Sequence, residues 1–124
     1  IFGTDMISLL KEAKIKFGNV NVYKTEYNAS DRAVTDLEKE GLVKVITDRK
    51  GRIQGAHIVG ANAGEIIQGF VLAKSLKIPL AKLSQLIFIY PTLSELVKKT
   101  AAKAFLEKAN NPFVKFLIKI MRRF

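Results

Sequence analysis

The sequence predicts an α+β fold in which an antiparallel β-sheet has helices packed on one face. Two apolar runs at residues 42–47 and 53–59, joined by a turn around Gly51, have the pattern of a β-hairpin. An alternating segment at residues 20–27 precedes them, and helical spacing dominates after residue 60. Strands early in a chain, with helices gathered toward its end, are typical of this fold class.

The first two segments of the chain predict a helix and then a strand. Residues 5–17 have apolar side chains at helical spacing, and Gly18 ends that pattern. Residues 20–27 alternate between two sets of side chains, as a strand does. The polar stretch at residues 28–40 follows and is expected to be rich in loops.

The hairpin is the strongest local prediction. Residues 42–47 are rich in β-branched side chains, which favour strands. The turn at residues 48–52 contains Gly51 at a position suited to a positive φ. Residues 53–59 are then expected to return as the second strand of the hairpin.

Three helices are predicted in the second half of the chain. The first follows Gly64 and ends at Pro79, because proline cannot continue a helix. A short apolar approach at residues 83–89 leads to the second helix, over residues 92–108. Residues 110–112 break that helix, and the last one runs to the C-terminus.

Composition limits the chain to one domain and excludes several kinds of site. Its 124 residues, nearly half of them apolar, suffice for a single core. The lack of cysteine excludes a disulfide, a thiolate metal site and a dithiol centre within the chain, and it is compatible with a cytoplasmic location. No apolar run is long enough to span a bilayer. The chain begins with Ile1 and has no signal-peptide pattern, so we expect a fragment of a longer protein.

The net charge of +10 results from 21 basic and 11 acidic residues, and a basic balance of this size attracts phosphate. Its distribution argues against nucleic-acid binding, because residues 96–124 hold eight basic side chains against one acid, Glu107. No arginine-rich arm, aromatic–glycine motif or zinc-finger spacing accompanies the charge. Nucleic acid is therefore not the expected partner.

The C-terminal segment, residues 110–124, is predicted to be a basic amphipathic helix appended to a domain over residues 1–109. Its apolar face consists of Phe113, Phe116, Leu117, Ile120, Met121 and Phe124. Lysine and arginine fill the opposite side. Such a face docks onto the domain or a partner subunit, which is the commoner fate, or it lies on an anionic membrane surface. Both interpretations stay open.

The segment at residues 90–95 reads Tyr-Pro-Thr-Leu-Ser-Glu and predicts the start of a helix. Pro91 fixes φ and stops any helix that arrives from upstream. Thr92 and Glu95 have the spacing of a capping box, in which the threonine accepts from an amide of the first turn and the glutamate reaches back. Taken alone, these residues have a structural role, with Thr92 as the helix cap.

Other residues of chemical interest have structural interpretations. Gly55, Gly60 and Gly64 match neither phosphate-loop pattern, and they predict tight turns and a close approach of helix to sheet. His57 is the sole histidine and lies in an apolar strand, so we expect it to be packed in the core. The acids between residues 31 and 40 are interpreted as loop residues. No metal site is predicted, because no cluster of ligating residues appears.

Four stretches taken together resemble one family, at residues 30–33, 42–60, 62–67 and 90–95. The hairpin, the Asn-Ala-Gly-Glu-Ile-Ile helix start and the Tyr-Pro-Thr-Leu-Ser-Glu segment are similar to motifs of the FAD-dependent pyridine nucleotide–disulfide oxidoreductases, in their C-terminal dimerisation domain. This family includes dihydrolipoamide dehydrogenases, glutathione reductases and mercuric reductases. The resemblance covers roughly residues 5–103.

The resemblance implies that the chain forms a homodimer, binds no cofactor itself and is not a complete enzyme alone. FAD and NAD(P)H would belong to other domains of the parent, which also carry a redox-active cysteine pair. In the family, a His-Pro-Thr-x-x-Glu segment lies beside the flavin and dithiol of the partner subunit, and its glutamate orients the acid–base histidine. This implies catalytic roles for Tyr90 and Glu95 in the partner's active site, with Pro91 near the partner's flavin.

Tyr90 departs from that motif, because the family commonly has histidine at its position. A tyrosine, with a reference pKa of about 10, is a poor general base at neutral pH. Mercuric reductases are similar in having tyrosine here, so the resemblance is closest to their branch. Tyr90 would then hydrogen-bond a thiolate or help to bind a soft metal. Glu95, without an imidazole to orient, keeps its capping role.

A two-fold interface between copies is expected on the helices. Its predicted residues are Ile66, Ile67, Phe70, Val71, Leu93 and Leu96. The alternative from another class is a freestanding basic module that binds a membrane surface or nucleic acid through the C-terminal helix. A parent enzyme tethered to a membrane by this tail would combine the two hypotheses.

Overall fold

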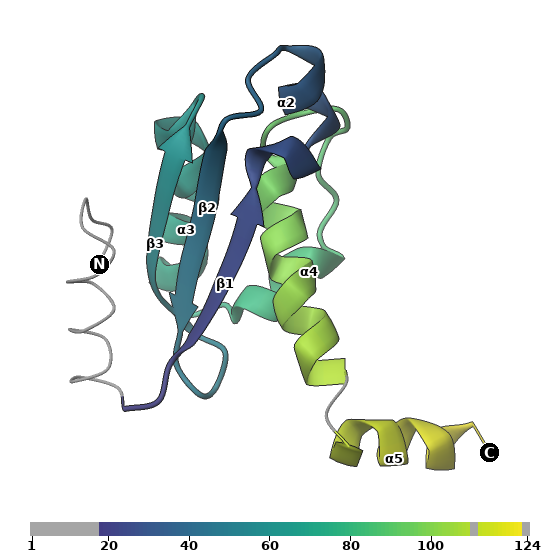
Figure 1. The fold of residues 1–124 in the computed structure, drawn as a ribbon. Helices are drawn as coiled ribbons and strands as arrows, with labels where there is room; N and C mark the ends of the chain where they lie inside the picture. Colours follow the sequence, from purple (N-terminus) through teal and green to yellow (C-terminus); the bar gives the residue numbers. More distant parts are fainter. Residues whose placement is uncertain (1–17, 110–111, 123–124) are drawn as a thin grey trace.

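The computed structural model describes residues 18–109 and 112–122 of the chain. The helix predicted over residues 5–17 lies outside the described residues. Within them, one strand is followed by short helices, then by two strands, and finally by the longer helices. Figure 1 shows the sheet as one layer and the long helices as a second layer beside it. The predicted α+β fold is confirmed.

The sheet has three antiparallel strands, β1 (Asn21–Glu26), β2 (Gly41–Thr47) and β3 (Ile53–Gly60), in that order. The predicted hairpin is confirmed, because Val45 of β2 pairs with Ala56 of β3. Both side chains are buried, whereas their neighbours along each strand point to the other face. The hairpin thus supplies the central part of the core.

The turn between β2 and β3 is organised by Asp48. Its Oδ1 atom accepts hydrogen bonds from the amides of Lys50 at 2.9 Å and Arg52 at 3.0 Å. Gly51 has a φ of 81°, the conformation that the sequence predicts for it. An aspartate that satisfies nearby amides in this way is typical of tight turns.

The connection between β1 and β2 contains more helix than its composition suggests. A 3-10 turn, η1 (Tyr27–Ala29), leads into a short helix, α2 (Asp31–Thr35). The Ser30 side chain accepts a 3.4 Å hydrogen bond from the amide of Ala33 and so caps α2. The prediction of a loop-rich stretch was therefore incomplete, because a serine N-cap allows one turn of helix in a polar sequence.

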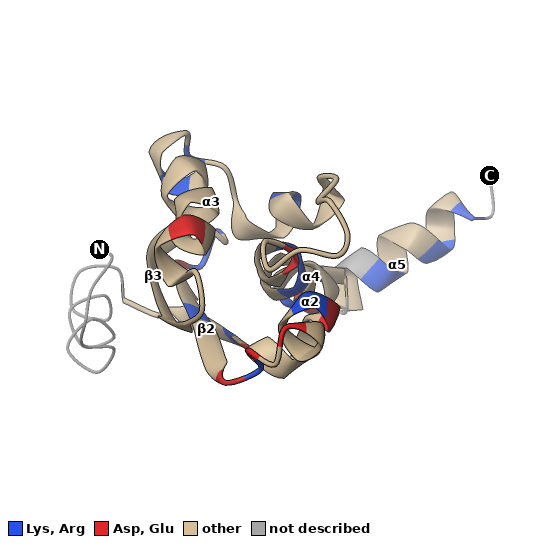
Figure 2. Cartoon of the chain, turned by 90° about the horizontal axis from the view of Figure 1, so that it is seen from above, with Lys and Arg blue, Asp and Glu red and all other residues tan. Residues whose placement is uncertain are grey.

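Four further elements follow the sheet, namely α3 (Ala63–Ser75), η2 (Leu80–Gln85), α4 (Glu95–Ala109) and α5 (Pro112–Met121). In Figures 1 and 2, α3 and α4 lie on the same side of the sheet, and within the sheet they contact mainly β3 and β1 respectively. Helices on one face of the sheet are thus confirmed. Figure 1 shows α5 beyond the end of α4, away from the sheet.

The helix α3 ends before Pro79, which was the predicted stop. Lys77 has a left-handed φ of 57°, and the amide of Ile78 donates a 2.8 Å hydrogen bond back to the carbonyl of Ala73. This arrangement is a common helix C-terminus, although glycine usually occupies the left-handed position. The helix therefore stops through its own cap rather than through the proline.

Tyr27 connects the sheet to α3 and is the largest fully buried side chain among the described residues. Its ring packs on Gly41 and Gly60, which pair across β2 and β3. Its hydroxyl donates a 2.7 Å hydrogen bond to the carbonyl of Ala61, just before α3. The close approach predicted at Gly60 exists, but the neighbour is this tyrosine ring and not a helix.

The prediction that His57 packs in the core is wrong. His57 pairs with Lys44 across β2 and β3, and strand alternation places it on the face opposite to Val45 and Ala56. It is half-buried there. Its apolar neighbours in sequence gave no indication of the face, because β3 carries apolar side chains on both.

Candidate functional site

Tyr90 lies in an extended segment between η2 and α4 that we call the 86–90 segment. Its apolar side chains are largely exposed, and Ile87 is 97% exposed. Only Phe88 turns inward and packs against the core, which anchors the segment. A run of exposed apolar side chains on a small domain marks an interaction surface. The sequence shows that this segment is apolar, but only the structure shows that its side chains are exposed.

The Tyr90 side chain is fixed by a contact from a distant part of the chain. Its hydroxyl donates a 2.6 Å hydrogen bond to Oδ2 of Asp31, the first residue of α2. The peptide bond between Tyr90 and Pro91 is cis. Asp31 is therefore a site residue that sequence reasoning missed, because 59 positions separate it from its partner.

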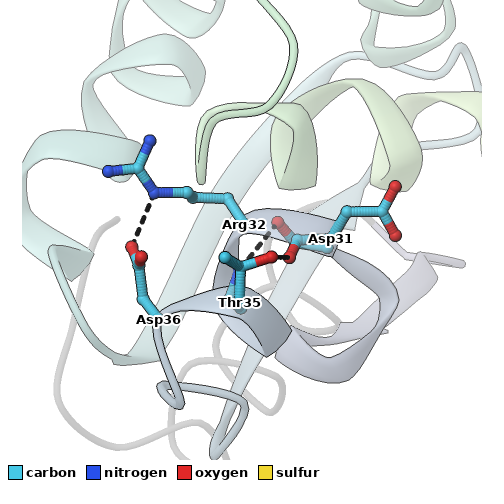
Figure 3. A network of polar contacts seen from close by, with 6 residues as sticks. Asp31, Arg32, Thr35 and Asp36 are labelled. Carbon is cyan, nitrogen blue, oxygen red and sulfur yellow. Dashed lines mark hydrogen bonds and ion pairs between the residues drawn. The ribbon is translucent and has the colours of Figure 1, made fainter.

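The helix α2 holds Asp31 in place through its own polar contacts. The Thr35 hydroxyl donates a 2.8 Å hydrogen bond to the carbonyl of Asp31, one turn earlier. Arg32 and Asp36 form an ion pair with a separation of 2.6 Å between Nε and Oδ2. Figure 3 shows these four side chains along α2, with Arg32 facing Asp36. The acids interpreted as loop residues thus include one that orders α2 and one that contacts Tyr90.

The surroundings of the Tyr90 hydroxyl favour its protonated form. The hydrogen bond to Asp31, and then the negative charge of that carboxylate, raise the pKa of Tyr90 above its ordinary value. The Glu95 carboxylate makes a smaller contribution in the same direction. The Tyr90 side chain is thus a hydrogen-bond donor at neutral pH, and it is unsuited to accept a proton.

The prediction of Thr92 as the cap of the following helix is wrong. The Thr92 hydroxyl donates a 2.6 Å hydrogen bond to the carbonyl of Ile89 instead of accepting one from an amide. The helix α4 begins three residues later, at Glu95. The amides of Glu95 and Leu96 donate to the carbonyls of Thr92 and Leu93, so a tighter turn precedes the helix.

Glu95 lies in the first turn of α4, where a negative charge suits the helix dipole. Its Oε2 atom is buried and has no hydrogen-bond partner within the described part of the chain. A buried carboxylate oxygen without a donor is costly, so its presence calls for an explanation. The capping box predicts a hydrogen bond from a backbone amide to the Glu95 side chain, but Oε2 does not make that bond.

Three of the six predicted interface residues belong to the core of the chain itself. Ile66, Phe70 and Leu96 are buried, and they pack between the sheet and the helices. The interface prediction is wrong for these three, because a side chain with no exposed surface has nothing to offer a partner. The apolar stripe at helical spacing is the face that α3 turns toward the sheet.

The other three predicted interface residues, Ile67, Val71 and Leu93, are half-buried, and their role stays a prediction. The outer side of α3 carries Leu72 and Leu76, which are more than 60% exposed. These leucines fit a partner surface better than the predicted stripe does. Pro91 is exposed and next to Tyr90, and its proximity to a flavin stays a prediction as well.

The apolar face predicted for the C-terminal helix is exposed. It consists of Phe113, Phe116, Leu117, Ile120 and Met121, and Phe124 lies outside the described residues. In the described ranges, no helix is both long and apolar enough to cross a bilayer. The same ranges hold no group of three or more acidic or histidine side chains arranged to bind a metal ion.

Comparison with protein families identifies the class of the chain. Residues 9–101 match the family described as pyridine nucleotide-disulphide oxidoreductase, dimerisation domain. Because this match covers most of the chain, the chain belongs to that family. The helix α5 lies beyond the matched residues.

Similar curated proteins agree with this assignment. The chain is 41% identical over 99 residues to a dihydrolipoyl dehydrogenase of Rhizobium etli, with 77% of this chain and 21% of that protein covered. It is 34% identical over 85 residues to a glutathione reductase of Burkholderia cepacia, with 68% and 19% covered. The chain thus spans about a fifth of the length of these relatives.

Solved structures share the fold. LpdA from Mycobacterium tuberculosis matches with a TM-score of 0.69 and 22% identity, over 77% of this chain and 21% of that one. The HOCl-induced flavoprotein disulfide reductase RclA from Escherichia coli matches with a TM-score of 0.68 and 24% identity, over 74% and 22%. At this level of identity the likeness concerns the fold alone.

Proposed function

We propose that this domain completes the active site of the partner subunit in a homodimeric flavoenzyme. Tyr90 is the residue that enters the partner's site, with Glu95 behind it and Pro91 toward the partner's flavin. FAD and NAD(P)H are held by other domains of the parent protein, where they supply the electron transfer. The observation that carries the proposal is an exposed phenol that is fixed by Asp31 and lies within reach of the Glu95 charge. The Oε2 atom of Glu95 is buried and has no donor among the described residues.

The surroundings of Tyr90 support a contact with a second subunit. Ile87 and Ile89 on the same segment expose apolar surface that a homodimer would bury. Asp31 holds the phenol without covering it, because Tyr90 remains 64% exposed. A preset orientation lowers the entropic cost of placing the hydroxyl against a reacting group.

The chemistry of a phenol with a raised pKa narrows the role of Tyr90. Because its single O–H proton is donated to Asp31, the Tyr90 hydroxyl presents an oxygen lone pair that contributes to binding a soft metal ion, and it donates to a thiolate only by giving up the bond to Asp31. In neither role does it act as the general base. The lack of a general base at position 90 favours a metal-ion substrate, as in mercuric reductases, over a disulfide substrate such as glutathione or lipoamide.

A mixed-dimer experiment on the parent enzyme tests this proposal. One protomer carries Tyr90→Phe, and the other carries serine in place of both cysteines of the redox pair. We expect the Tyr90→Phe homodimer to lose at least about 100-fold in NAD(P)H oxidation, because a preorganised polar group at the reacting atoms contributes that much. The other homodimer should be inactive, because it has no redox-active cysteines. Random mixing should then restore about a quarter of wild-type activity, because half of the dimers regain one intact site.

The outcome separates a contribution to the partner from one within the subunit. If Tyr90 served its own subunit, no mixed dimer would hold a complete site and mixing would restore nothing. Tyr23→Phe is the matched control, because it removes a hydroxyl outside the 86–90 segment and should leave activity unchanged. Parallel assays with Hg(II) and with a disulfide as acceptor test the substrate class, and turnover with the disulfide alone would contradict it.

A further inference from the structure

The helix α5 presents an apolar surface that is largely exposed. Phe116 is 59% exposed and Met121 is 73% exposed, and Phe113 and Leu117 on the same side are exposed as well. Large apolar side chains at this density are rare on a free surface and mark a site of interaction. Because α5 lies beyond the residues that match the dimerisation family, the family's interface does not account for this face.

One edge of α5 faces the rest of the domain. Ile118 lines an apolar cleft with Pro79 and Phe105, where α5 meets η2 and α4. Residues three and four apart share a face of a helix, so Phe113, Phe116 and Ile120 lie together on a side turned away from Ile118. The contact with the domain therefore leaves the aromatic face outward.

The charge of α5 indicates what kind of surface it meets. Lys115, Lys119 and Arg122 lie on the side opposite the aromatic face, and the sequence has no acid after Glu107. Figure 2 shows basic residues along α5 and no acidic ones. A helix that combines an apolar face with cations alone is complementary to a surface that is apolar inside and anionic outside.

A second copy of the chain is a poorer occupant for this face. A helix of ten residues is about 15 Å long, and it offers far less area than the roughly 800 Å² per partner of a stable interface. Binding to a membrane does not require the contact area of a protein–protein interface. Burial of apolar side chains among the lipids adds to the attraction between the lysine and arginine side chains and anionic headgroups.

We propose that α5 lies in the headgroup region of an anionic membrane and holds the protein to its surface. The aromatic face enters the boundary between headgroups and acyl chains, and the three cations remain among the phosphates. With ten residues, α5 lies on the bilayer and does not cross it. This inference goes beyond the proposed function and does not depend on it.

Co-sedimentation of the full chain with lipid vesicles tests the proposal. At about 50 mM salt, we expect binding to phosphatidylcholine vesicles with about 30% phosphatidylglycerol and none to pure phosphatidylcholine. Lys115→Gln, Lys119→Gln and Arg122→Gln together should weaken binding roughly 100-fold, at about fivefold for each cation. Phe116→Ser with Met121→Ser should weaken it by at least about tenfold.

Matched controls remove the same groups elsewhere on the surface. Lys39→Gln, Arg49→Gln and Lys50→Gln together lower the net charge equally, and Leu37→Ser removes an exposed apolar side chain; both should bind much as the wild type does. Failure to sediment with anionic vesicles overturns the proposal. So does a loss of binding that is equal in the control and α5 variants, or a preference for duplex DNA over vesicles at the same salt concentration.

Discussion

Gly60→Ala should destabilise the domain by about 3 kcal/mol or more, a large effect for a single methyl group. Gly60 has a φ of 147°, in a region that side chains with a Cβ atom rarely adopt. A methyl group there would lie 2.5 Å from Cζ of Tyr27 and 2.7 Å from its Cε2 atom. The ring is fully buried and fixed by its hydrogen bond to Ala61, so it has no room to move.

Gly64→Ala is the matched control for this prediction. Gly64 lies in α3 with no neighbouring atom within 4 Å of the added methyl group. Alanine favours a helix over glycine by roughly 0.5–1 kcal/mol, so the control should be as stable as the wild type or slightly more so. Urea unfolding followed by circular dichroism, at one fixed protein concentration, measures both. Equal stability of the two variants would contradict the packing of Tyr27 on Gly60.

Phe70→Ala should lower the free energy of unfolding by about 3–5 kcal/mol, because it empties a large volume in the core. Phe70 is 0% exposed and packs between α3 and the sheet. Its neighbour on the outer side of α3, Leu72, is 62% exposed. In the monomer, at a concentration below that of dimerisation, Leu72→Ala should therefore change the free energy of unfolding by less than about 0.5 kcal/mol.

Thermal or urea unfolding of the two variants separates core from interface on α3. Both changes replace a large apolar side chain with alanine in the same helix, so differences in helix propensity are small. A mild effect of Phe70→Ala combined with a large effect of Leu72→Ala would reverse the assignment of the two faces. It would restore the original prediction that the Phe70 stripe meets a partner.

The hairpin and α3 were predictable because each depends on a local pattern. Alternation and a Gly51 turn define β2 and β3, and the spacing from Ile66 to Ala73 defines the buried face of α3. The same spacing misled the choice of interface residues. A core and an interface are both apolar. Periodicity alone therefore does not tell whether an apolar stripe packs against the chain's own sheet or against a partner.

The candidate site was only partly predictable, because its geometry depends on contacts between distant segments. The motif at residues 90–95 indicates where the site lies, but Asp31 reaches Tyr90 from a helix that the polar sequence conceals. Thr92 has the spacing of a helix cap, yet its hydroxyl donates a hydrogen bond to the carbonyl of Ile89 instead. Side chains such as threonine have several local partners, and the spacing does not select among them.

Sedimentation equilibrium tests the central claim, that this chain is a dimerisation domain, most directly. The chain has a mass of 13.8 kDa. Between roughly 1 and 100 µM, the mean mass should rise from that value toward twice that value, as a concentration-dependent dimer requires. A mass of 13.8 kDa across the whole range would contradict the claim.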